Sequence, residues 1–231
     1  MYIYLYLNIF TIFFPFVLSF DKRVKFYKNW PYLFPAILVN AFIFITWDSF
    51  FTRLGVWGFN PDYLVGWYLF GLPLEELLFF LTVPYACVFI YETLNTYLKI
   101  DYIQPYAKWL SVGLVIFLVP VGFIFLPRLY TSITFLALAV MLGLHYLVLK
   151  NYILGRFYVA YLVHLIPFLL VNGVLTAIPI VWYNNKYNLG LRITTIPAED
   201  TMYSMLMLLI TITVYELLKR KNTKQINNSL V

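Results

Sequence analysis

The chain has 231 residues, of which 63% are hydrophobic, 21% are aromatic and only 11% are charged. A soluble domain needs more polar side chains to cover its surface, so this composition excludes an ordinary soluble protein and predicts an integral membrane protein. The net charge of +6 comes from short basic runs between apolar segments. Such runs orient membrane proteins, and we therefore expect no nucleic-acid partner.

Seven apolar segments follow in chain order, each near the roughly 20 residues that a bilayer crossing needs. They run from Tyr2 to Phe20, Pro31 to Phe51, Tyr68 to Thr93, Trp109 to Leu126, Thr131 to Lys150, Phe157 to Trp182 and Met202 to Leu218. We expect an all-α protein of seven transmembrane helices. The first segment is read as a retained span, because no positive residue precedes it and no small-residue cleavage site follows it.

The basic residues divide unequally between the two sets of loops. Four lie on one side, namely Arg53, Arg128, Lys186 and Arg192, and the other twelve lie on the opposite side: Lys22, Arg23, Lys25, Lys28, Lys99, Lys108, Lys150, Arg156, Lys219, Arg220, Lys221 and Lys224. Because cytoplasmic loops carry the excess of Lys and Arg, the N-terminus is predicted outside and the C-terminus inside. We expect a multi-pass protein of the cell membrane whose lipid partner is the bilayer itself.

A motif of proline, one spacer residue and two acids occurs twice. The first copy is Gly71-Leu72-Pro73-Leu74-Glu75-Glu76 and the second is Thr195-Ile196-Pro197-Ala198-Glu199-Asp200, 124 positions later. The same offset aligns further identical pairs, among them Asn60 with Asn184, Tyr63 with Tyr187, Gly66 with Gly190, Tyr91 with Tyr215 and Glu92 with Glu216. The chain is therefore predicted to be an internal duplication.

The duplication divides the chain into a 3+1+3 arrangement. Residues 1–100 form a first three-helix repeat, residues 101–128 a connector with the fourth helix, residues 129–218 a second three-helix repeat, and residues 219–231 a basic cytoplasmic tail. Four crossings separate equivalent points, so the repeats are parallel and both motifs lie at the same side of the membrane.

The acids of the motif are candidate catalytic residues. A proline followed by acids is also a common helix start, because proline suits the first turn and acids suit its positive end. Ionisable groups in a membrane helix are nevertheless rare and usually face a functional interior. We take Glu75, Glu76, Glu199 and Asp200 as candidates; adjacent residues are about 100° apart on a helix, so one of each pair should face inward.

Other polar residues have lesser predicted roles. Asp48 and Asn172 occupy equivalent positions near the ends of the preceding apolar segments, and they are expected to support the acids. A cluster of carboxyl groups that shares a proton can act as both acid and base. Glu92 and Glu216 lie four to five turns further along and are expected to pair with lysines near the inner surface. The single cysteine, Cys87, has no partner, so neither a disulfide nor a thiolate metal site is expected.

The two motifs, each in a three-span repeat, resemble those of the membrane-embedded carotenoid cyclases of the heterodimeric bacterial and the fused archaeal or fungal type. The resemblance implies a lycopene cyclase that converts acyclic carotenoid ends to β-rings, giving β-carotene. It implies a non-redox isomerase or intramolecular lyase that uses no cofactor and no metal, and no Gly-x-Gly-x-x-Gly fingerprint occurs in the sequence. With both repeats in one chain no second kind of subunit is needed, and a homo-oligomer stays open.

Two other classes remain open at this stage. A small-solute transporter can also have 3+1+3 repeats, although its polar groups are expected near the midplane and not near one face. A membrane prenyltransferase would need acids three or four residues apart to hold magnesium and diphosphate, and adjacent acids do not provide this spacing.

Overall fold

The structure, a computed structural model, describes residues 2–147, 149 and 152–229. Lys150, which ends the fifth predicted span and was counted among the basic residues of the C-terminal side, lies outside the described residues. So do Met1, Leu230 and Val231, the last two in the predicted tail.

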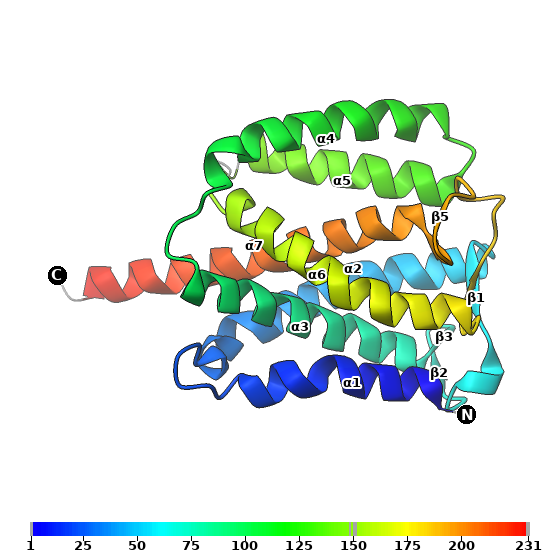
Figure 1. The fold of residues 1–231 in the computed structure, drawn as a ribbon, viewed down its shortest axis with the longest axis horizontal. Helices are drawn as coiled ribbons and strands as arrows, with labels where there is room; N and C mark the ends of the chain where they lie inside the picture. Colours follow the sequence, from blue (N-terminus) through cyan, green and yellow to red (C-terminus); the bar gives the residue numbers. More distant parts are fainter. Residues whose placement is uncertain (1, 148, 150–151, 230–231) are drawn as a thin grey trace.

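The described part of the chain is a bundle of seven α-helices, which confirms the predicted all-α class (Figure 1). The helices are α1 Ile3–Leu18, α2 Trp30–Arg53, α3 Leu74–Tyr97, α4 Gln104–Ile124, α5 Leu129–Leu147, α6 Leu154–Ala177 and α7 Ala198–Ser229. All except α1 are long and apolar enough to cross a membrane. The chain is therefore an integral membrane protein.

The helix bounds differ from the predicted spans by a few residues, and at three helices the difference has a clear local reason. The first is shorter, because the chain leaves the helix at Leu18 and turns through the short 3-10 helix η1, Phe26–Asn29. Helix α3 begins only at Leu74, since the preceding residues from Tyr68 form a hairpin. Helix α7 continues to Ser229, so the basic segment predicted as a tail is largely helical.

Short strands at one end of the bundle were not predicted. Strand β1, Trp57–Phe59, pairs antiparallel with β4, Val181–Tyr183. Two hairpins precede the motif helices: β2, Tyr68–Leu69, pairs with β3, Leu72–Pro73, and β5, Arg192–Ile193, pairs with β6, Ile196–Pro197. We call this end of the bundle the strand end; α1 begins there, while the chain finishes at the opposite end (Figure 1).

The two halves of the chain match element by element at the offset of 124. Helices α2 and α6 begin and end at equivalent residues, and α3 and α7 begin at equivalent residues. The β1–β4 pair joins the two halves. On either side of it, the Asn60 N–H donates to the Ile180 carbonyl at 2.9 Å and the Asn184 N–H donates to the Val56 carbonyl at 2.9 Å. Both motif helices therefore start at the strand end, where this pair of strands joins the two halves.

At the far end of the bundle, side chains of α3 and α7 form a second pair of reciprocal hydrogen bonds between the halves. The Tyr91 hydroxyl donates to Glu216 at 3.1 Å, and the Tyr215 hydroxyl donates to Glu92 at 2.8 Å. Lys219 forms an ion pair with Glu92 at 2.7 Å, which agrees with the lysine partner expected for Glu92. A continuous hydrophobic core between these two ends fixes α3 and α7 relative to each other.

Candidate functional site

Each motif sits at a tight hairpin that turns directly into a helix. Pro73 caps α3 in an extended conformation, and the Leu74 N–H bonds the Trp67 carbonyl at 2.8 Å; in the second copy the Ala198 N–H bonds the Leu191 carbonyl at 3.0 Å. The hairpin turns hold Phe70 and Thr194 at positive φ angles of 57° and 58°. Bulky or β-branched residues rarely adopt this conformation, so the surrounding structure imposes it at both sites.

Glu75 and Glu199, the first acids of the two motifs, hold these hairpins in place. The Glu75 side chain accepts the Val65 N–H at 2.5 Å, and the Glu199 side chain accepts the Leu189 N–H at 2.6 Å. Thr131 also donates to Glu199, at 2.6 Å. Both carboxyl groups are fully buried, and neither residue lines the cavity described next.

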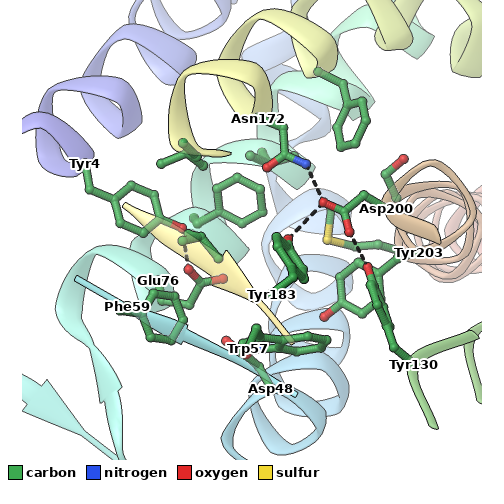
Figure 2. A pocket seen from close by; sticks show the side chains of 17 residues that line it. Tyr4, Asp48, Trp57, Phe59, Glu76, Tyr130, Asn172, Tyr183, Asp200 and Tyr203 are labelled. Carbon is green, nitrogen blue, oxygen red and sulfur yellow. Dashed lines mark hydrogen bonds between the residues drawn. The ribbon is translucent and has the colours of Figure 1, made fainter. Parts of the chain in front are cut away.

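Glu76 and Asp200, the second acids, face a common cavity at the strand end (Figure 2). Asp48 and Asn172 line the same cavity, so the structure brings together four of the six polar residues named from the sequence. The two residues of each motif point apart because successive side chains on a helix diverge by about 100°. Both halves of the chain contribute to one site.

The first half supplies a pair of carboxyl groups. The Tyr4 hydroxyl donates to Glu76, and the Trp57 indole N–H donates to Asp48. Asp48 and Glu76 are buried and close enough for their carboxyl groups to share a hydrogen bond. Two neighbouring carboxyl groups in a buried site do not both ionise readily, so this pair is suited to keep a proton.

The second half supplies a single carboxyl group surrounded by donors. Asp200 accepts hydrogen bonds from the Tyr130 hydroxyl at 2.6 Å, the Asn172 amide at 2.7 Å and the Tyr183 hydroxyl at 2.9 Å. Burial, together with the nearby Asp200, raises the pKa of Tyr183 well above its usual range, so the phenol stays protonated and donates. Three donors stabilise the ionised form of Asp200.

The cavity has aromatic walls. Trp57, Phe59, Phe79, Tyr183 and Tyr203 line it, and the Trp57, Tyr130 and Tyr203 rings pack on one another with centroids 5.0 to 6.2 Å apart. Aromatic faces attract cations, by about 2 kcal/mol when water is excluded. The arrangement thus combines a proton donor, a proton acceptor and walls that tolerate positive charge.

The tyrosines of the site were not predicted from the sequence. Tyr4 and Tyr130 bond equivalent acids but lie 126 residues apart, because the first half has two more residues than the second between this tyrosine and the start of the next α-helix. An alignment that allowed this gap would have paired them. Tyr183 is the counterpart of Phe59 at the offset of 124. The two side chains differ only in the hydroxyl group of Tyr183, which donates to Asp200.

Comparison with known proteins identifies the family. The pattern of the family described as lycopene cyclase matches residues 1–94 and 127–218, which is more than half of the chain. The chain belongs to the lycopene cyclase family. The matched ranges contain one motif each, and the unmatched stretch between them contains α4, so the family signature coincides with the two halves that build the cavity.

Curated relatives match over shorter segments. The chain is similar to bifunctional lycopene cyclase/phytoene synthases of Aspergillus oryzae (29% identity over 30% of this chain), Podospora anserina (36% over 26%) and Colletotrichum graminicola (35% over 33%). The matched segments span only 12%, 10% and 14% of those proteins. No solved structure matches the chain significantly.

Proposed function

We propose that this protein is a lycopene cyclase that closes acyclic carotenoid ends to β-rings, giving β-carotene from lycopene. One observation carries the proposal: in a member of this family, the second acid of each motif faces one buried, aromatic cavity together with Asp48. The relatives named above, whose printed names include lycopene cyclase, support the same activity.

In this proposal the Asp48–Glu76 pair is the proton donor. The transferable proton resides on this pair, whose two buried carboxyl groups are close enough to share it. Its transfer to the terminal trisubstituted alkene forms a C–H bond and leaves a tertiary carbocation. The neighbouring alkene attacks that carbon, so the ring bond forms and the positive charge moves onto the ring.

Asp200 is the proposed proton acceptor. Its hydrogen bonds with Tyr130, Tyr183 and Asn172 favour a carboxylate, which stabilises the cation and then removes a ring proton to form the new double bond. One proton enters and one leaves for each ring, so the reaction is an isomerisation that needs no oxidant or reductant. Glu75 and Glu199 are positioning residues in this scheme, since they fix the hairpins before α3 and α7.

The wider architecture is part of the same proposal. We infer two parallel three-helix repeats, α1–α3 and α5–α7, joined by α4, with the strand end outside and the C-terminus inside. Matching element bounds at the offset of 124 support the repeats. The excess of basic residues at the opposite end supports the orientation in the cell membrane. A single chain would contain both halves of the site and require no other kind of subunit.

Solvent labelling tests the reaction. Purified protein in lipid vesicles is given unlabelled lycopene in D2O, without flavin or nicotinamide. The proposal expects a cyclised product that is one mass unit heavier for each ring, because the proton added to the alkene comes from an acid in exchange with solvent, whereas the proton lost comes from a different carbon. Cyclised product without deuterium, or an absolute requirement for a reduced cofactor, would contradict the acid–base mechanism. Failure to cyclise lycopene at all would contradict the function.

A further inference from the structure

A groove between α1, α3 and α6 continues from the carboxylate cavity toward the opposite end of the bundle. Phe79, Val83, Phe168 and Asn172 line both spaces, so the groove and the cavity adjoin. The groove has a volume of about 260 Å³, against about 60 Å³ for the cavity. It extends along α3 from Phe79 to Ile90, which corresponds to about 16 Å of helix.

The walls of the groove are almost entirely apolar. Phe10 and Phe14 of α1 face Ala86 and Ile90 of α3 and Val171 of α6. The wall has few polar groups: Thr11 donates to a carbonyl of its own helix at 2.8 Å, Cys87 Sγ lies 3.1 Å from His164 Nδ1, and His164 Nε2 is buried without a hydrogen-bond partner among the described residues. A groove of this kind suits a long hydrocarbon and offers little to a polar solute.

The groove opens sideways, toward the surface that a spanning helix presents to lipid. Its rim residues Phe10, Phe14 and Leu170 are 59%, 56% and 66% exposed. Helices α1 and α6 make few contacts with each other, whereas each packs closely on α3. A hydrophobic molecule dissolved in the bilayer can therefore enter the groove between α1 and α6, beside the cavity that holds the acids.

The corresponding place in the other half of the chain carries different side chains. The counterpart of Ala86 on α7 is Ile210, a larger side chain that packs against the hydrophobic core, and the counterpart of His164 on α2 is the fully buried Asn40. The two halves therefore differ in the residues that would form such a groove.

We propose that this groove binds the conjugated chain of the acyclic carotenoid while one of its ends lies at Glu76 and Asp200. The inference rests on the proposed function, because it names where the body of that substrate lies. The wall that the groove shares with the carboxylate cavity, its apolar lining and its opening to the bilayer select a rod-shaped polyene as the occupant.

The single cysteine gives a test that is independent of catalysis, because Cys87 lies in the groove wall. The Glu76→Gln variant is placed in lipid vesicles, and the rate at which a membrane-permeable maleimide modifies Cys87 is measured with and without lycopene. Bound polyene should slow modification several-fold. The control variant carries Leu162→Cys with Cys87→Ser; residue 162 is on the lipid-facing side of α6, 64% exposed, and its modification should not respond to lycopene.

A second measurement uses a blocked groove in otherwise unmodified protein. Ala86→Trp fills the groove at a residue that does not line the carboxylate cavity, and it should raise KM for lycopene at least tenfold. Leu162→Trp should leave KM unchanged. If lycopene does not protect Cys87, or if Ala86→Trp keeps the wild-type KM, while the wild-type protein cyclises lycopene, the groove inference is overturned and the function stands. Protection of Cys87 without any cyclised product from the wild-type protein would instead overturn the function and leave the groove as a polyene site.

Discussion

The adjacent acids Glu75 and Glu76 allow the proposed assignment to be tested within one helical turn. Both are buried, at 0% and 8% exposure, and both are carboxyl groups, yet only Glu76 lines the cavity. Replacement by glutamine keeps the size of either side chain and removes its ability to carry a transferable proton. The two substitutions are therefore matched in chemistry and in depth, and they differ in what the side chain touches.

Their expected effects differ in kind. Glu76→Gln should lower the cyclisation rate by about 10² to 10⁴, the usual contribution of a general acid or base, which equals about 2.7 to 5.4 kcal/mol of transition-state stabilisation. Glu75→Gln retains an oxygen that can accept the Val65 N–H, but it exchanges a charge-assisted hydrogen bond for a neutral one. That exchange should cost about 1 to 2 kcal/mol of stability, and the rate should fall by less than about tenfold.

The assay measures initial rates of β-carotene formation by purified variants in lipid vesicles, normalised to the amount of protein that melts cooperatively. Glu199→Gln and Asp200→Asn provide the same comparison in the second half. Activity losses of equal size for Glu75→Gln and Glu76→Gln, at unchanged melting behaviour, would refute the assignment of the proton-donating role to the cavity acids.

Other consequences of the structure are open to measurement. Asp48→Asn should reduce cyclisation by about 10² or more, because Glu76 loses the carboxyl neighbour that keeps a proton in the site, and wild-type rates in this variant would argue against the shared proton. Glu92→Gln should leave the rate within a few-fold of wild type and lower the melting temperature, since it weakens contacts with Lys219 and Tyr215 at the opposite end of the bundle. A cut in the loop at residues 98–103 should give two pieces that are inactive alone and active when co-expressed, because the first supplies Asp48 and Glu76 and the second supplies Asp200; pigment analysis showing product from one piece would contradict this. A time course should show free monocyclic carotenoid before the bicyclic product if one groove serves both ends in turn, and bicyclic product without that intermediate would count against it.

Only the tertiary structure shows which acid of each motif faces the cavity and which bonds the backbone. The sequence shows two adjacent acids at the start of a helix, and the helical angle between them means that one faces inward. Which one does so depends on how the preceding hairpin turns. The chain turns at Phe70 and Thr194, and the N–H groups of Val65 and Leu189 then lie within reach of Glu75 and Glu199. Glu76 and Asp200 are left to face the cavity.

The class of the protein, its helices, its repeat and its candidate acids follow from the sequence, because membrane burial and duplication leave local patterns that a single chain displays. The apolar segments, the offset of 124 and the repeated Pro-x-acid-acid motif are such patterns. The partners of the acids are different, since Tyr4 lies 72 residues from Glu76 and Tyr130 lies 70 residues from Asp200. The groove likewise depends on Ala86, Phe14 and Val171 from three separate helices. Contacts between distant segments are fixed by helix packing, which no local pattern encodes, so the donors around Asp200 and the groove became visible only in the folded chain.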